Sequence, residues 1–182
     1  NEPNDPLRPE LWGMDKIGMP EVWARQVGSQ SGPIIAVLDT GCDMTHPDLR
    51  DNLWTNRREI PGNGIDDDGN GVVDDVHGYN ACHQTGDPYD DDSHGTHCAG
   101  TIAAKGNNAE GVVGVNWEAQ LMPVKMMVKG EGTVADTVRA VIYATKNGAS
   151  ITSNSYSGPY NQAEYEVFAS SPLLHVCAAG NE

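Results

Sequence analysis

Three residues far apart in the sequence carry functional groups suited to acid–base and acyl-transfer chemistry. Asp39 ends a short apolar run, where its carboxylate could cap a turn, accept a structural hydrogen bond or orient a catalytic base. His94 opens a segment with helical features, and an imidazole with a pKa near about 6.5 can take up and return a proton at neutral pH. Asn181 follows a small-residue segment, where it could form a turn or donate its amide to a developing oxyanion. Together, these residues are candidates for one catalytic site.

Two other kinds of site are compatible with single motifs. Asp39-Thr40-Gly41 also opens the active-site motif of pepsin-like proteases, which need two such carboxylates sharing one proton. The sequence holds no second Asp-Thr-Gly or Asp-Ser-Gly, which argues against that class. His94 and His97 could together bind zinc, although the glutamate of a His-Glu-x-x-His zinc helix is absent. We expect His97 to be a buried helix residue, and a zinc hydrolase is a rival hypothesis that metal analysis would test.

An acidic segment indicates a bound cation. Between Glu59 and Ala104 the sequence contains no Lys or Arg, and like charges at this density repel unless an ion or solvent screens them. Residues 66–74 reproduce the spacing of an EF-hand loop, in which alternate oxygens converge on Ca²⁺ and Gly71 permits the sharp turn. A solvated acidic loop is the alternative, and Mg²⁺ suits such a crowded, flexible site less well. The expected ligands are oxygen atoms of Asp66, Asp68, Asn70, Val72, Asp74 and Asp75.

The overall composition limits the class of partner. The 182 residues include 11 Lys and Arg against 26 Asp and Glu, and the net charge of −15 disfavours nucleic acid as a partner. No apolar run reaches the roughly 18 residues of a membrane span, and no signal peptide opens the sequence. The 4 cysteines form no Cys-x-x-Cys pair, which disfavours zinc, and a Cys42–Cys82 disulfide stays an open possibility. We therefore expect a globular acidic protein without a membrane span.

Short apolar runs alternate with segments of helical periodicity. We expect strands over residues 33–38, 121–128, 150–154 and 173–179, and helices over residues 94–104, 134–146 and 160–170. Thr133 and Asp136 resemble a capping box at the start of the second of these helices. This alternation predicts an α/β fold with a parallel sheet and helices on both faces. Active sites of such sheets lie at the carboxyl ends of the strands, which is where Asp39 and Asn181 fall.

Four motifs follow one another along the chain: Asp39-Thr40-Gly41, His46-Pro47-Asp48-Leu49, the heptapeptide from His94 to Gly100, and Ala179-Gly180-Asn181. In this order they resemble the subtilisin family of serine proteases. The opening Asn4-Asp5-Pro6 is similar to the thermitase branch, and the acidic insertion is similar to subtilases of apicomplexan parasites and many bacteria. The resemblance implies a three-layer α/β/α fold and a serine endopeptidase that acts on polypeptides. It also implies that Asp39 orients the imidazole, His94 is the general base and then the general acid, and Asn181 donates to the oxyanion.

The resemblance further implies substrate-binding segments and a second calcium site. Ser155, Tyr156 and Ser157 match the segment that pairs with the substrate backbone, with Ser157 where the family usually has Gly. The segment Lys129, Gly130, Glu131 and Gly132 matches the opposing substrate-binding strand. The strong calcium site of subtilases corresponds here to Asp5, Asp48 and oxygen atoms of Lys105, Asn108, Glu110 and Val112.

The nucleophile is the one part of the family pattern that the 182 residues do not contain. Family members carry it in a Gly-Thr-Ser-Met-Ala segment well downstream of the oxyanion Asn, and no such segment occurs here. We expect residues 1–182 to be the N-terminal part of one peptidase domain, truncated before the Ser. The expected protein is a secreted or vesicular, monomeric, calcium-dependent endopeptidase with an inhibitory propeptide. The alternative is a pseudoprotease that acts as a calcium-stabilised peptide-binding module.

Overall fold

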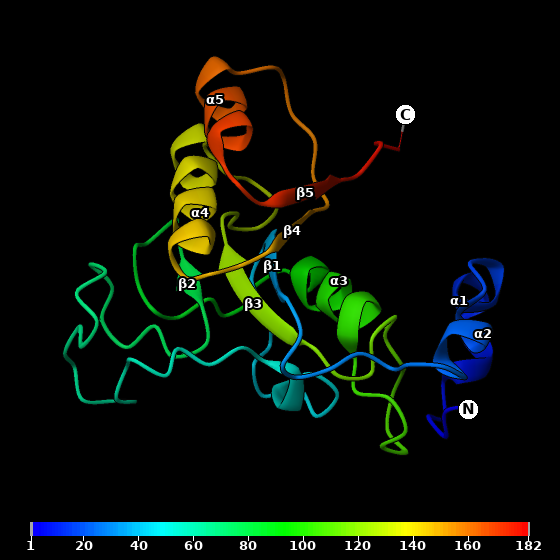
Figure 1. Ribbon diagram of the computed structural model, residues 1–182. Helices are drawn as coiled ribbons and strands as arrows, with labels where there is room; N and C mark the ends of the chain where they lie inside the picture. The colour runs from blue at the N-terminus through cyan, green and yellow to red at the C-terminus, as the bar shows by residue number, and fades with distance from the viewer. Residues whose placement is uncertain (1, 182) are drawn as a thin grey trace.

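A five-stranded sheet forms the centre of the computed structural model, which describes residues 2–181 (Figure 1). The strands are β1 (Ile34–Asp39), β2 (Tyr79–Asn80), β3 (Gln120–Lys125), β4 (Ile151–Asn154) and β5 (Leu174–Cys177). Their order is β2-β3-β1-β4-β5, and every neighbouring pair is parallel. The predicted α/β fold with a parallel sheet is therefore confirmed.

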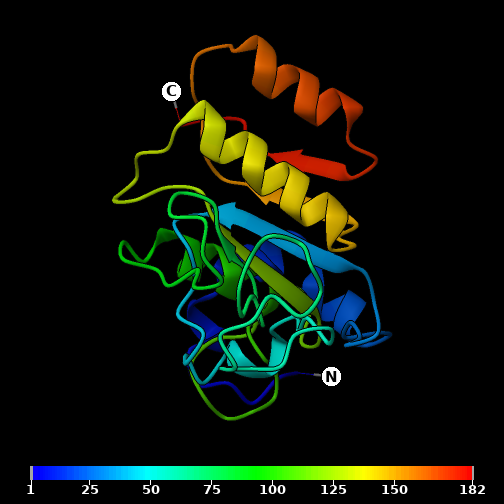
Figure 2. The ribbon, with the colours of Figure 1, turned by 90° about the vertical axis from the view of Figure 1, so that its left-hand side faces the viewer.

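Helices cover both faces of this sheet, as Figure 2 shows. The main helices are α3 (His94–Ala103), α4 (Val134–Lys146) and α5 (Gln162–Ser170), and the shorter ones are α1 (Trp12–Lys16), α2 (Met19–Trp23) and the 3-10 turns Arg8–Glu10 and Arg50–Asn52. Helix α3 packs on one face, where Val37, Ala99 and Leu121 share a core. Helix α4, with α5 beside it, packs on the other face, where Leu38 and Val141 belong to a second core. The sheet thus lies between two helical layers.

Local sequence explains where α4 begins and ends. Thr133 Oγ1 accepts a hydrogen bond from Asp136 N–H, while the Asp136 carboxylate accepts from the Thr133 N–H, so the predicted capping box is confirmed. The helix ends at Lys146, and Gly148 follows with a positive φ of 81°, a conformation that glycine adopts without steric cost. These signals act within a few residues, which is why sequence alone located this helix.

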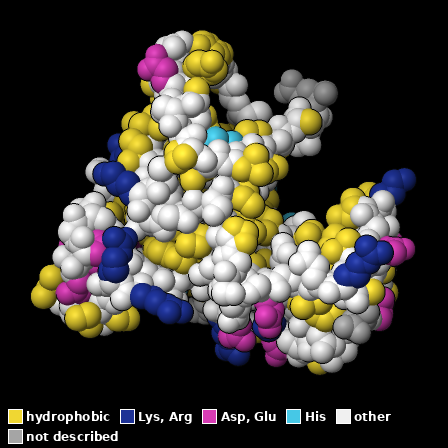
Figure 3. Space-filling model, in the orientation of Figure 1, with side chains coloured by type: hydrophobic (Ala, Val, Ile, Leu, Met, Phe, Trp, Pro, Cys, Tyr) yellow, Lys and Arg dark blue, Asp and Glu magenta, His cyan; other side chains and the backbone are white. Residues whose placement is uncertain are grey.

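Helices α1 and α2 form a small unit with a core of its own. Met14, Met19 and Trp23 pack there against Trp117, and the Trp23 indole donates to a backbone carbonyl at 2.9 Å. A cavity of about 1090 Å³ separates this unit from α3. Figure 3 shows an open gap between the part of the molecule that holds this unit and the central body, with hydrophobic side chains on the side of the central body. Trp12 lines this cavity and is 76% exposed.

Several details differ from the sequence expectations. Strand β3 ends at Lys125 instead of residue 128, because the chain turns back at Val128 to form a bridge with Glu131. The prediction that His97 is buried is wrong, since its side chain lies on the side of α3 that faces the cavity and is exposed. All four cysteines are free, so the structure contains no Cys42–Cys82 disulfide. Among residues 2–181, no helix is both long and apolar enough to cross a membrane.

Candidate active site

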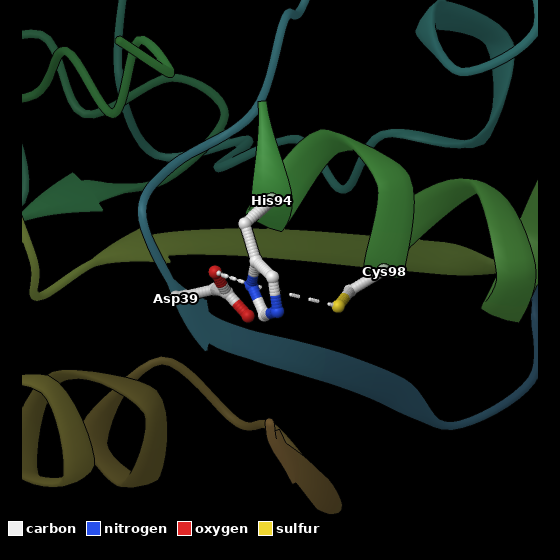
Figure 4. Close-up of side chains that lie close together, drawn as sticks. All are labelled: Asp39, His94 and Cys98. Carbon is white, nitrogen blue, oxygen red and sulfur yellow. Dashed lines mark hydrogen bonds and ion pairs between the residues drawn. The ribbon is translucent and has the colours of Figure 1, made fainter. Parts of the chain in front are cut away.

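The carboxyl end of β1 and the start of α3 bring Asp39 and His94 into contact (Figure 4). Asp39 Oδ1 and His94 Nδ1 are 2.7 Å apart, which is hydrogen-bond distance. The approach is close because Gly95 has no side chain: a Cβ atom there would collide with the carbonyl oxygen of Gly41. The two residues are 55 positions apart in the sequence, so the fold, and not local structure, makes the pair.

The groups around Asp39 and His94 determine which ring nitrogen of His94 carries a proton. The Asp39 side chain is buried, and its Oδ1 atom also accepts the Thr40 N–H at 2.7 Å. An ionised carboxylate can only accept, so His94 Nδ1 carries the shared proton and Nε2 is left with a lone pair. The hydrogen bond that His94 donates to Asp39 raises the pKa of His94, although partial burial of the ring opposes this effect. The arrangement therefore gives a general base held in one tautomer.

Cys98 is a neighbour of the pair that the sequence analysis did not single out. Its Sγ atom lies 3.9 Å from His94 Nδ1, one helical turn further along α3. Burial raises the pKa of the Cys98 thiol. Because the thiolate is the nucleophilic form, this environment does not make Cys98 a nucleophile. The only signal in the sequence was the position of Cys98 within the His94–Gly100 heptapeptide.

The two predicted substrate-binding segments differ from each other in backbone conformation. Ser155, Tyr156 and Ser157 directly follow β4, and the Tyr156 hydroxyl donates to Asn154 Oδ1 at 3.3 Å. Lys129, Gly130, Glu131 and Gly132 form an exposed turn and not the extended strand that the resemblance implied. Lys129 and Gly130 have φ values of 52° and 77°, which reverse the chain between Val128 and Glu131.

Asn181 lies just beyond β5, at the sheet edge where Asp39 ends β1. Strand β5 pairs with β4, which pairs with β1, so the carboxyl ends of these parallel strands share one edge. The Asn181 side chain is exposed. No hydrogen bond among residues 2–181 joins Asn181 to Asp39 or His94, so its catalytic role stays a prediction.

The expected second calcium site is a buried carboxylate pair wrapped by a loop. Asp5 and Asp48 are 3% and 1% exposed, and neither forms a salt bridge within residues 2–181. The loop 105–112 surrounds them: the Asn107 and Asn108 N–H groups donate to Asp5, and the Asn108 amide and the Val112 N–H donate to Asp48. Two desolvated carboxylates without a cationic partner fit a bound divalent cation. Lys105 and Glu110 lie in the same loop, and the Lys105 ammonium group binds Glu118.

The first half of the acidic insertion is a series of tight turns closed by side-chain oxygens. Asp66 accepts the N–H groups of Asn70 and Gly71, Asp68 accepts the Asn70 N–H, and Asn70 Oδ1 accepts the Val72 N–H. These turns place successive side-chain oxygens on the same side of the loop. Arg58 pairs with Asp68 at 2.9 Å, so a metal ion would compete there with a guanidinium group.

The second half of the insertion differs from the expected ligand set. Asp74 accepts the N–H groups of Gly62 and Gly64 and does not join the other candidate ligands. Asp75 is fully buried and accepts hydrogen bonds from the Asn70 amide and the Tyr143 hydroxyl. Burial raises the pKa of Asp75, and the bond from Tyr143 opposes this effect.

Glu59 completes this acidic group from outside the insertion. Ligand atoms of Glu59, Asp68 and Asp75 lie within 4.8 Å of one another, a set of oxygens suited to a hard cation. Glu59 also accepts backbone N–H groups from Asp67 and Asp74, which fixes its position. Sequence analysis missed Glu59 because it precedes the recognisable loop.

Comparisons with known proteins are consistent with the geometry of the Asp39–His94 pair. Residues 30–182 match the sequence profile described as the subtilase family, Peptidase_S8. The chain is 36% identical over 180 residues to Subtilisin-like protease 1 of Plasmodium berghei (strain Anka), covering 97% of this chain and 29% of that protein. It is 36% identical over 176 residues to the Major intracellular serine protease of Bacillus subtilis (strain 168), covering 93% of this chain and 49% of that protein.

A solved structure is also similar over the whole chain. It is described as proteases from Pseudoalteromonas arctica PAMC 21717, and it matches with a TM-score of 0.76 and 26% sequence identity. The match covers 100% of this chain and 60% of that one. This chain therefore spans only part of each of these three proteins, and less than a third of the Plasmodium berghei relative.

Proposed function

The chain belongs to the subtilase family, and we propose that it supplies the aspartate and the histidine of a serine endopeptidase site. The observation that carries this proposal is the 2.7 Å contact between Asp39 Oδ1 and His94 Nδ1. Such a contact holds a catalytic imidazole in one tautomer and stabilises the imidazolium that forms during acyl transfer. The proposed substrates are polypeptides, and the proposed reaction is hydrolysis of their peptide bonds.

Each group has one task in this mechanism. Asp39 accepts the Nδ1 proton, so that His94 Nε2 can take the proton of a serine hydroxyl as it attacks the scissile carbonyl carbon. His94 then returns this proton to the departing amine. Asn181 donates its amide to the oxyanion, and in subtilisin the loss of such a donor lowers kcat about a hundred- to thousandfold. The serine itself is proposed to follow position 182, because the family's nucleophile segment does not occur within the 182 residues.

Labelling of the active site tests this proposal most directly. The full-length protein is expected to react stoichiometrically with a fluorophosphonate probe and to cleave a mixture of internally quenched peptides. His94→Ala and Asp39→Asn are expected to lose the labelling. Asp39→Asn should lower kcat by about ten-thousandfold, the loss when the orienting aspartate of a Ser-His-Asp triad on an unrelated fold is replaced, and His94→Ala should lower it by about a millionfold. Asp51→Asn, an exposed carboxylate outside the site, is the matched control. A full-length protein that binds peptides but neither cleaves nor labels would favour the peptide-binding module.

Substrate binding is proposed to use the two segments that follow β3 and β4. The backbone of Ser155–Ser157 leaves β4 at the same sheet edge as Asp39, so a peptide lying along it would pass His94. The exposed turn 129–132 is proposed to border the same groove. Its positive-φ residues indicate that the turn would have to rearrange to pair as a strand.

Calcium is proposed to bind at both acidic sites and to have a structural task. Asp5, Asp48 and Asn108, with carbonyl oxygens of Lys105, Glu110 and Val112, would hold one ion; buried carboxylates without a cationic partner support this. Asp66, Asp68, Asn70, Val72 and Asp75, together with Glu59, would hold another. Bound calcium would neutralise carboxylates that the fold has taken out of water. Asp74 is left out of this set because both of its oxygens bind the N–H groups of Gly62 and Gly64 and it does not belong to the group of Glu59, Asp68 and Asp75.

Three further properties of the whole protein stay predictions. They are an inhibitory propeptide, a monomeric state and a secreted or vesicular location. The two acidic sites support a calcium-rich compartment, whereas the Bacillus subtilis relative is named an intracellular protease. Fractionation of cells that express the full-length protein would decide the location.

A further inference from the structure

A buried carboxylate joins the two turns that carry the catalytic pair. Asp90 lies in the loop before α3 and is 7% exposed. It accepts five hydrogen bonds, from backbone and hydroxyl donors on both turns. The donors are the Thr40 hydroxyl at 2.9 Å, the Asp92 and Ser93 N–H groups at 3.0 Å each, and the Thr96 N–H and hydroxyl at 2.9 and 2.6 Å. Asp90 therefore has more hydrogen-bond partners than a carboxylate that is only solvated on the surface of a loop.

Thr40, the residue next to Asp39, takes part in this hydrogen-bond network through its hydroxyl group. It donates its proton to Asp90 and accepts the Gly95 N–H at 2.9 Å, so one oxygen bridges the β1 turn and the first turn of α3. The Thr40 N–H in turn donates to Asp39 Oδ1, the same atom that accepts from His94. Any displacement of Thr40 would thus move both partners of the pair.

The backbone next to His94 needs such an external support. Ser93 precedes the helix with a φ of 94°, in the left-handed region that residues other than glycine rarely adopt. The Ser93 side chain makes no capping hydrogen bond. The Asp90 carboxylate acts as the cap instead, because it accepts the Ser93 and Thr96 N–H groups. Asp90 thus satisfies N–H groups at the turn that places His94 beside Asp39.

We propose that Asp90 is a positioning residue that, through the Thr40 hydroxyl, fixes the orientation of the His94 imidazole toward Asp39. The inference rests on the proposed function, since it assigns a task within the same site. Asp90 forms no hydrogen bond with the imidazole among residues 2–181, so its effect on the position of the ring passes through the backbone and Thr40, in addition to its Coulombic effect on the ring.

The charges around His94 determine which variant is informative. The groups that act on its ring are Asp39 at the end of β1, Asp90 and Asp92 in the preceding loop, and Cys98 on α3. Asp91, between these loop residues, instead binds the buried Lys125 ammonium group at 2.5 Å. Burial alone would raise the pKa of Asp90, but the hydrogen bonds from Thr96 and Ser93 lower it, so Asp90 stays ionised. Asp90→Asn would therefore change charge and geometry together, whereas Thr40→Val removes only the hydroxyl bridge.

The test compares Thr40→Val with Thr40→Ser in the full-length protein. The pKa of His94 is measured by NMR titration of its ring protons, assigned with a His94→Gln variant, beside kcat and KM for peptide cleavage. Thr40→Val is expected to shift the His94 pKa down toward 6.5 and to lower kcat about a hundredfold, the cost of a small misplacement of reacting groups, with KM little changed. Thr40→Ser keeps the hydroxyl and is expected to restore both values.

The controls separate positioning from general stability. Thr55→Val makes the same change of side chain at an exposed site away from the catalytic pair and is expected to alter neither value. Thr40→Ala removes the same hydroxyl but does not introduce a β-branched apolar side chain. It must show the same fall in the pKa of His94. Unchanged His94 pKa and kcat in folded Thr40→Val or Thr40→Ala protein would overturn the proposal. Absence of peptidase activity in the wild-type protein would instead refute the proposed function, and the NMR titration would still test the positioning.

Discussion

The hydrogen bond between Asp39 and His94 links a buried charge to an imidazole whose side chain is 49% exposed. Because Thr40 N–H and His94 Nδ1 both donate to the same oxygen, the carboxylate is held in one orientation. The bond favours the protonated ring and raises the pKa of His94, while partial burial of the ring acts in the opposite direction. At the scale of residues, the site is therefore a base whose proton affinity depends on one contact.

The pH dependence of catalysis tests this contact. Only neutral His94 can accept the serine proton, so kcat/KM of the full-length protein should rise with pH around a midpoint above 6.5. Asp92→Asn removes a smaller, Coulombic contribution and should lower the midpoint slightly, and added salt should weaken this effect because Asp92 is exposed. The pH profile of kcat/KM at two salt concentrations measures both effects. A midpoint below 6.5 in the wild type would contradict the assignment of the base.

Helices in this fold begin in two different ways. Helix α4 is capped by its own residues, since Thr133 and Asp136 bond each other across the first turn. Helix α3 instead depends on Asp90 and on close contact with the β1 turn, where Gly95 leaves room for the Gly41 carbonyl. At the scale of elements, the structural helix is locally encoded, and the helix that carries His94 is held by tertiary contacts.

Removal of the α4 cap tests whether this helix is stabilised by its own first-turn residues. Thr133→Ala loses the hydroxyl that accepts the Asp136 N–H, and we expect the free energy of unfolding to fall by about 1 kcal/mol. Chemical denaturation of the full-length protein measures the change. Thr55→Ala, an exposed threonine outside any helix, is the control and should have no effect. Equal stability of the wild type and Thr133→Ala would show that packing of α4 outweighs its cap.

The molecule as a whole carries a net charge of −15 and buries several of its carboxylates. Asp5 and Asp48 are enclosed by the loop 105–112, and Asp75 is enclosed between the acidic insertion and α4. Repulsion among these groups opposes folding unless cations bind. At this scale, calcium would join segments that are distant in sequence into one body.

Chelation of calcium tests this arrangement. An ion that binds only the folded state at a concentration 100 times its Kd adds about 2.7 kcal/mol of stability, so a chelator should lower the Tm of the full-length protein. Asp48→Asn and the double variant Asp66→Asn with Asp68→Asn should each remove part of the calcium dependence of Tm, and their combination should remove most of it. Asp51→Asn is the control, because its carboxylate is exposed. A Tm that is independent of calcium in the wild type would mean that the acidic sites bind no calcium.

The behaviour of residues 1–182 expressed alone is a further prediction at this scale. Leu174 and Val176 on the edge strand β5 are 62% and 53% exposed, and apolar strand edges promote association. We expect this polypeptide to be poorly soluble, inactive on peptides and unlabelled by a fluorophosphonate probe, because it lacks the family's nucleophile segment. Size-exclusion chromatography and mass spectrometry measure these properties. Stoichiometric labelling of a monomeric product would require a nucleophile among its own serines.

Signals that act over a few residues determined much of this protein from the sequence alone. The alternation of apolar runs and helical periods predicted the parallel sheet, and the order of motifs indicated Asp39 and His94 as partners. The capping box of α4 and the first turns of the acidic insertion also follow from spacing, because each hydrogen bond there spans at most five residues.

Only the tertiary structure decided the contacts between distant segments. Asp90 is one of nine aspartates in a continuous acidic stretch, and nothing in its spacing distinguishes it from Asp92. Glu59 belongs to the acidic group with Asp68 and Asp75, and Asp74 does not. The reason is that the chain folds back so that Asp74 binds the N–H groups of Gly62 and Gly64. His97 is exposed because it lies on a face of α3 that does not pack against the sheet. Which face packs depends on the rotation of the helix relative to the sheet. Hydrogen bonds across more than 50 residues, such as that from the Gly95 N–H to the Thr40 hydroxyl, have no local pattern, since they depend on where independent elements pack.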